Sequence, residues 1–278
     1  MRWMLAGGAA LFLLIVGGIV LALRNGGDDE TLTSGVMPLP PPVKQADPAA
    51  DPDGAEVPRL MKRSEAELLA EAEPLARKFL EARTVEEMLK VVRNPGETGA
   101  RLRRRYPDGR ITPPGLAEFN AGNAVAYADH TASVDVRTAD FAVRQLDFVG
   151  TPAGLRIDWE SWAGWCELPW NDFLAKRPTD PQVFRVIMRK VDYYNFEFAD
   201  DGKWRSYRLE SQDGDHGLYG YVERGSVLDE RLLLDADAKQ ARVILKLRFP
   251  EGSAGTEQVR IEELVNDGWV MPDTTDSP

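Results

Sequence analysis

The chain has 278 residues and a net charge of −11, with 34 basic against 45 acidic side chains. This acidity disfavours binding to a nucleic-acid backbone, which requires basic side chains that neutralise phosphates, and it disfavours lying flat on anionic lipid. We therefore expect no nucleic-acid partner. Without the first 24 residues the chain is long enough for one large or two small domains. A hydrophobic content of 43% with seven tryptophans is enough to build their cores.

The first 24 residues predict a membrane anchor. Residues 3–23 carry no charged or strongly polar side chain, and Arg2 and Arg24 bracket them. At ~1.5 Å per residue a helix over this run spans roughly 31 Å, about the thickness of the hydrocarbon core of a bilayer. A cleaved secretory signal is the alternative, with Val20 and Ala22 at the −3 and −1 positions.

The predicted orientation rests on the very short basic N-terminal tail, which is typical of a signal anchor. We expect a single-pass protein with a cytoplasmic N-terminus and extracytoplasmic soluble domains, periplasmic if the protein is bacterial.

Residues 25–63 predict an unstructured spacer. The segment holds seven of the 19 prolines among Asp, Ala and Gly, without apolar periodicity. Such a composition cannot bury enough surface to offset the entropy of ordering. Residues 272–278 predict a disordered tail.

Three short helices are expected over 64–106. Ser64 and Glu67 form one predicted capping box, and Thr84 with Glu87 forms another. Pro74 should kink or break the first helix. Asn94 and Pro95 should start the third, as cap and first helical residue.

Arg101, Arg103, Arg104 and Arg105 cluster on the third predicted helix. A phosphate or headgroup patch is one interpretation. A solvated basic face paired with nearby acids is the other, and the shortness of the cluster favours it.

From about residue 124 the apolar period changes from helical to alternating. Segments 131–136, 141–148 and 155–159 predict strands, with a turn over 150–154. Helices followed by an antiparallel sheet predict an α+β layer over 64–166, with the helices packed on a curved sheet.

The second half, 167–271, predicts a small barrel. A connecting helix over 170–176 precedes expected strands at 183–198, 204–209 and 218–222. A helix from Ser226 to about Ala238 and strands at 243–249 and 258–270 follow.

Two resemblances follow from these patterns. The helices and strands that end in the segment RIDWESWAGW, residues 156–165, resemble the cone-shaped NTF2-like fold, and the segment is similar to one in an uncharacterised group of bacterial membrane-anchored proteins. The order of three strands, helix and two strands over 182–271 resembles an OB-type barrel. NTF2-like members include isomerases, dehydratases and non-catalytic binding modules, so the resemblance implies no shared activity.

Motifs for common chemistries are missing from the sequence. His130 and His216 are the only histidines and Cys166 is the only cysteine, and no metal-binding, phosphate-binding or nucleophile-elbow motif occurs. We expect no cofactor, no metal and no disulfide. Cys166, close to Trp165 and Leu168, is expected to be a buried small hydrophobe.

Two functional hypotheses remain. The first is a non-catalytic extracytoplasmic module that binds a protein or envelope partner, through an exposed apolar patch most plausibly formed by Trp162, Trp165 and Trp170. These tryptophans could equally form a core between the domains.

The second hypothesis is a small-molecule binding protein or a general acid/base enzyme that uses a cone cavity. Its titratable residues would be Asp158, Glu160, His130 and Tyr127. If the strand over 155–160 alternates with its apolar residues inward, Asp158 and Glu160 point to solvent, which argues against catalysis.

Overall fold

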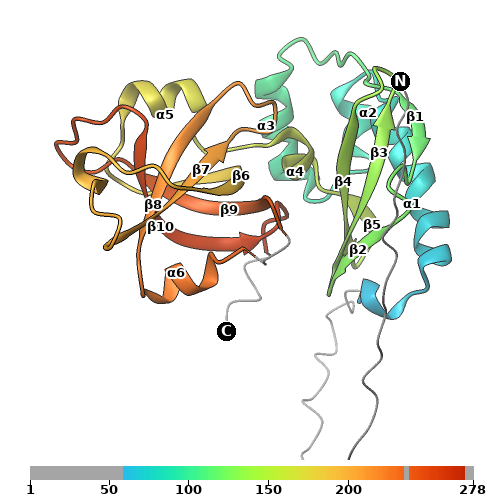
Figure 1. Ribbon diagram of the computed structural model, residues 1–278. Coiled ribbons are helices and arrows are strands. Elements are labelled where there is room, and N and C mark those ends of the chain that lie inside the picture. The colour runs from blue at the N-terminus through green and yellow to red at the C-terminus, as the bar shows by residue number, and fades with distance from the viewer. Residues whose placement is uncertain (1–58, 235–237, 273–278) are drawn as a thin grey trace, which may run out of the picture. The chain divides into compact units, whose positions relative to one another are not determined.

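The structure is a computed structural model that describes residues 59–234 and 238–272 (Figure 1). All of them belong to one unit, Asp53–Pro278. The predicted anchor, residues 3–23, most of the predicted spacer and nearly all of the predicted tail lie outside the described residues. Among the residues described, none of the helices has the length and apolar character needed to cross a membrane.

Helices come first along the described chain. They are η1 (Leu60–Lys62), α1 (Glu65–Leu80), α2 (Val85–Leu89) and α3 (Pro95–Arg105). The Ser64 hydroxyl accepts from the Glu67 amide at 3.3 Å, and the Glu67 carboxylate accepts from the Ser64 amide at 3.2 Å, which confirms the first capping box. The Thr84 hydroxyl likewise caps α2.

Two expectations about these helices are corrected and a third is confirmed. The folded part begins before Ser64, because Leu60 is only 1% exposed and its amide donates to the Asp129 carbonyl at 2.8 Å. Pro74 does not end α1, since it lies on the exposed side of a continuous helix that buries Leu68 and Phe79 on its other side. The start of α3 is confirmed, with Asn94 at the cap position and Pro95 as the first helical residue, although the Asn94 side chain makes no cap hydrogen bond.

An antiparallel sheet follows the helices. Its strands are β1 (Leu116–Phe119), β2 (Val125–Ala128), β3 (Thr131–Thr138), β4 (Val143–Thr151) and β5 (Gly154–Ile157). The order is β1-β3-β4-β5, and β2 also pairs with β3. Every second residue of β3 is buried, from Ala132 to Thr138, as the alternating pattern predicts. The fold class is therefore mixed α+β with an antiparallel sheet.

The last predicted strand of this sheet is too long. It ends at Ile157, because the Asp158 carboxylate accepts from the Ser161 amide at 2.6 Å and caps α4 (Trp159–Ala163). This cap turns the chain out of the sheet, and Trp159 is helical.

The rest of the chain forms a second sheet, closed into a barrel. Its elements are α5 (Trp170–Lys176), β6 (Gln182–Val191), η2 (Phe196–Phe198), β7 (Trp204–Glu210), β8 (Gly217–Glu223), α6 (Val227–Arg231), β9 (Ala241–Arg248) and β10 (Gln258–Asp267). The strand order is β10-β8-β7-β6-β9, with β8 and β10 parallel and the other pairs antiparallel.

Two predicted elements of the barrel end early. The strand predicted over 183–198 stops at Val191, where the Ser206 hydroxyl donates to the Val191 carbonyl at 2.6 Å and accepts from the Tyr193 amide at 3.1 Å in place of ladder bonds. The helix predicted from Ser226 to about Ala238 ends at Arg231, and Leu232 is its C-terminal cap.

Two large hydrophobic clusters stabilise the described chain. One includes buried residues from Leu60 to Trp162 and packs α1 on the first sheet. The other includes buried residues from Phe173 to Leu264 and fills the barrel. Trp165 packs against the first cluster and the adjacent Cys166 against the second.

The burial of Leu60 yields a stability prediction. Leu60→Ala should lower the free energy of unfolding by about 2–5 kcal/mol, because it leaves a cavity under η1. Lys62→Ala, at an exposed position of the same turn, should change it by no more than about 0.5 kcal/mol. Thermal melting of both variants checks this, and equal melting temperatures would place Leu60 outside the core.

Candidate functional site: an arginine- and tryptophan-lined cleft

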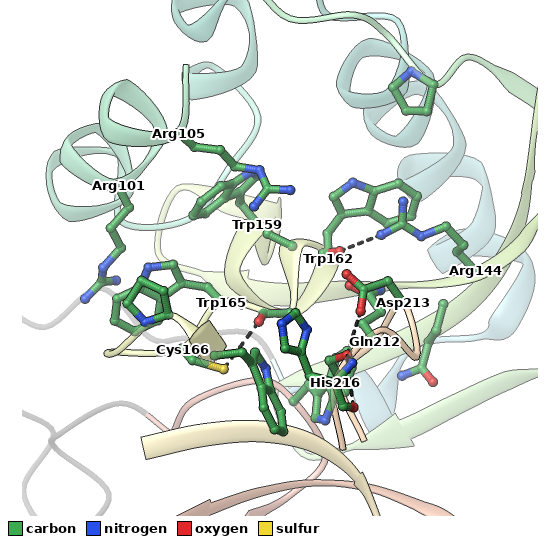
Figure 2. A pocket seen from close by; sticks show the side chains of 18 of the residues that line it. Arg101, Arg105, Arg144, Trp159, Trp162, Trp165, Cys166, Gln212, Asp213 and His216 are labelled. Carbon is green, nitrogen blue, oxygen red and sulfur yellow. Dashed lines mark hydrogen bonds between the residues drawn. The ribbon is translucent and has the colours of Figure 1, made fainter. Parts of the chain in front are cut away.

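The described chain has a cleft of about 1010 Å³ (Figure 2). Its lining side chains come from the first cluster and from the barrel, including α3, β4, α4, α5, β9 and the turn between β7 and β8. That turn, over 211–216, packs closely on Gly164, because a Cβ there would lie 3.1 Å from the Gln212 side chain. Gly164 also has a φ of 58°, which favours glycine at this C-cap.

The cleft is basic although the protein is acidic. Five arginines line it, against the two acids Glu167 and Asp213: Arg101, Arg104, Arg105, Arg144 and Arg242. Arg104 and Arg105 are exposed on the last turn of α3, which favours cations because of the helix dipole. The cleft therefore concentrates positive charge in a chain whose net charge is −11.

Five of the seven tryptophans line the same cleft: Trp159, Trp162, Trp165, Trp170 and Trp269. Three of them lie under guanidinium groups. Arg144 stacks over Trp162 at 3.7 Å from the ring centroid, Arg101 over Trp165 at 4.3 Å, and Arg242 over Trp269 at 3.9 Å. Stacking of this kind holds a guanidinium flat and leaves its N–H edge available for other partners.

A buried ionic network lies beside the cleft. The Arg185 side chain is fully buried and donates to Glu160 at 2.8 Å, to the Trp165 carbonyl at 2.7 Å and to the Trp269 carbonyl at 2.8 Å. Arg101 pairs with the other oxygen of the Glu160 carboxylate. Burial lowers the pKa of Arg185, although nearby acidic groups oppose this shift.

Asp158 belongs to the same network. Its carboxylate lies 2.7 Å from the Arg93 guanidinium, which also donates to the Met271 carbonyl at 2.8 Å. Burial raises the pKa of Asp158, and the charges of Arg93 and Arg185 act against that shift. Glu160 thus ties α4 directly to β6, and Asp158 is linked to Met271, after β10, through Arg93.

The three predicted binding tryptophans all line the cleft, but they form no exposed patch. Trp162 is 7% exposed in the first core. Trp165 is half-buried between Arg101 and Arg185, and Trp170 packs edge-on against Phe184 at 5.0 Å. Trp170 also stacks with His216 at 5.8 Å between ring centroids.

The alternative pocket is not assembled from its predicted residues. Asp158 and Glu160 lie in the buried network rather than facing solvent, because the strand ends before them. His130 lies beside Asp129 at 3.1 Å, at the turn between β2 and β3, and Tyr127 is on β2. None of these four residues lines the cleft.

Of the predicted arginine cluster on α3, part is paired with nearby acids and part is unpaired within the described chain, so neither the solvated basic face nor the anion-binding patch describes all four residues. Arg101 and Arg103 lie near acids, including Glu97 and Glu86 at 3.8 Å each. Among the described residues Arg104 and Arg105 have no such acid, and they line the cleft, as does the paired Arg101.

Cys166 packs against the barrel core, and burial raises its pKa to about 11. At neutral pH it is therefore a protonated thiol and a poor nucleophile. Among the residues described, no group of three His, Cys, Asp or Glu side chains could hold a metal ion.

Sequence reasoning missed Arg144, Arg185, Arg242 and Trp269. A signal existed for Arg185, because an arginine inside the apolar run VFRVIM of a strand needs a buried partner. Arg144 and Arg242 had no such signal, since an arginine in an alternating strand is ordinarily solvated.

Comparisons with known proteins give no relative that could assign this site. The chain matches no protein-family model, no curated protein and no solved structure.

The buried pair yields a second stability prediction. Glu160→Gln should lower the free energy of unfolding by about 3–5 kcal/mol, because Arg185 loses its carboxylate partner inside the protein. Glu97→Gln removes only a partly solvated contact of Arg101 and should cost no more than about 1 kcal/mol. Chemical denaturation of the two variants measures the difference. Equal midpoints would show that Glu160 contributes no more than a surface acid.

Proposed function

We propose that the protein is a membrane-anchored, non-catalytic module that binds a protein or envelope partner outside the cytoplasm, and that the cleft is its binding site. The observation that carries this proposal is the gathering of five arginines and five tryptophans around one cleft of an acidic protein. Tryptophan and arginine are the residue types that most often dominate binding energy at interfaces.

The size and chemistry of the cleft support a ligand with both charged and apolar parts. Its volume of about 1010 Å³ is at the upper end of the ~300–1000 Å³ of small-molecule sites, so it can accept a short segment of a partner as well as a small molecule. Stacked guanidiniums supply hydrogen-bond donors for anionic groups, and the tryptophan edges supply apolar contact.

The anchor belongs to the same proposal. Residues 3–23 would span the membrane with the N-terminus in the cytoplasm, and the spacer would hold the cleft away from the bilayer. The acidic surface favours this arrangement, because anionic headgroups would repel the soluble part.

The finer fold assignments are also proposals. Three helices before an antiparallel sheet support an NTF2-like layer, and the DWE segment supports a relation to the bacterial membrane-anchored group. The barrel order β10-β8-β7-β6-β9, the parallel β8–β10 pair and the helix α6 between β8 and β9 support an OB-type barrel.

The location can be tested with a reporter that is active only outside the cytoplasm, fused after Pro278. We expect activity in the membrane fraction, because a short basic tail keeps the N-terminus inside. A stable but inactive fusion would place the domains in the cytoplasm. Activity in the soluble fraction would show that the anchor is cleaved.

Cross-linking in cells can test the cleft as a binding site. A photoreactive benzoylphenylalanine at Thr112, exposed and on the cleft wall, should give a discrete adduct. The same group at Val227, 75% exposed on α6 and remote from the cleft lining, should give none.

Matched charge reversals sharpen this test. Arg105→Glu should reduce the Thr112 adduct several-fold, because Arg105 is exposed on the cleft wall. Arg103→Glu, on the same helix but outside the cleft lining, should leave it unchanged. Equal effects of the two reversals, or the same adducts from Thr112 and Val227, would contradict the proposal.

A further inference from the structure

Two arginines of the cleft are partly buried, stacked on tryptophan rings and, among the residues described, without an ion pair, whereas Arg104 and Arg105 are exposed. Arg144 on β4 and Arg242 on β9 lie flat over Trp162 and Trp269, and neither makes an ion pair within 4.0 Å inside the described part of the chain. Arg101, by contrast, is paired with Glu160. Arg144 and Arg242 are therefore cations held in fixed positions without a contacting counterion.

Their hydrogen bonding is incomplete as well. Arg144 donates to the Trp162 carbonyl at 2.8 Å. The Nη2 atom of Arg242 is buried and has no hydrogen-bond partner. A buried guanidinium donor without an acceptor costs free energy, so the charge of Arg242 is only partly satisfied inside the protein.

Arg144 and Arg242 line the same cleft, and their surroundings disfavour the charged form of each. Burial is the main cause that lowers the pKa of Arg144, and the charges of Arg242 and Arg105 lower it further, against Asp140. Burial also lowers the pKa of Arg242, and only the charges of Asp147 and Asp135 oppose this. Asp147 already accepts from Ser133 at 2.5 Å and Gln145 at 2.6 Å.

We infer that Arg144 and Arg242 form an oxyanion subsite of the cleft, which binds a carboxylate or phosphate group of the ligand. The inference rests on the proposed function, since it names the chemistry that the binding site recognises. An oxyanion accepts from the solvent-facing N–H groups of the two guanidiniums and supplies the negative charge that both lack at contact distance within the described chain. The tryptophan rings underneath fix the direction in which the N–H groups point.

Anion binding to the full-length protein in detergent tests the subsite. The probes are inorganic phosphate and a triglutamate peptide, at constant ionic strength, and the readouts are tryptophan fluorescence and the melting temperature. We expect saturable binding of at least one probe. Competition between the two probes shows whether the subsite prefers a carboxylate or a phosphate group. Triglutamate as the tighter probe indicates a carboxylate of an acidic segment, and phosphate as the tighter probe indicates a phosphorylated ligand.

Substitutions separate the subsite from general salt effects. Arg242→Gln and Arg144→Gln should each weaken probe binding about tenfold or more, as expected for the loss of one charge-assisted hydrogen bond. Arg242→Lys should also weaken it, because an ammonium group keeps the charge but lacks the planar fork. Arg208→Gln is the matched control, since Arg208 lies over the Tyr219 ring at 4.9 Å and does not line the cleft.

The melting temperature without anion distinguishes a binding role from a structural one. In the empty protein the cost of burying the unpaired Arg242 charge offsets its stacking on Trp269, so Arg242→Gln should melt close to the wild-type temperature. A drop of several degrees for both Arg242→Gln and Arg242→Lys would make Arg242 a structural group and overturn the inference. Binding of neither probe, or an equal response of Arg208→Gln and Arg242→Gln, would also overturn it.

The failures of the two proposals differ. An Arg105-dependent adduct from Thr112 without anion binding would keep the cleft as a binding site and reject the subsite. Anion binding that depends on Arg242, without any such adduct in cells, would keep the subsite and reject the partner-binding function.

Discussion

The buried guanidinium of Arg185 is the contact on which the cleft depends. It leaves β6 and reaches acceptors in two other segments: the Glu160 carboxylate and the Trp165 carbonyl in and just after α4, and the Trp269 carbonyl after β10. Both segments contribute walls of the cleft. The rigidly arranged N–H donors of one guanidinium can hold β6 and both segments together, which a lysine in the same place could not do.

The main effect of this network is to position the side chains of the cleft, and its net contribution to stability is small. Two charges removed from water lose hydration that their attraction only roughly compensates, so an apolar replacement of the whole pair could be as stable. An apolar pair would lack directional bonds, however. Glu160 shares its two oxygens between Arg185 and Arg101, and Arg101 is thereby held over Trp165. The buried Glu160 carboxylate thus determines where Arg101 lies in the cleft.

The sequence predicted local structure well and distant contacts poorly. Helix caps at Ser64 and Thr84 and the alternation of β3 depend on neighbours within a few residues, so they can be found from spacing. The burial of Asp158 and Glu160 could not be found from spacing, because it depends on ion pairs with the distant residues Arg93 and Arg185. Because the predicted strand continues past Ile157, the side chains of Asp158 and Glu160 are expected to point to solvent. The spacing of Asp158 and Ser161 instead fits the helix cap that the structure has.

The acidity of the chain constrains how an anionic ligand could be recognised here. Surface charges are screened beyond about 8 Å at physiological salt, so the acidic exterior repels an anion only weakly until it is near the protein. Inside the cleft an anion would meet five arginines and two acids, and partial burial would weaken the competition from water. Recognition would then depend on short-range fit to the stacked guanidiniums rather than on attraction from a distance. A site of this kind selects a compact anionic group with apolar neighbours and discriminates against extended polyanions, which would have to lie along the acidic surface as well.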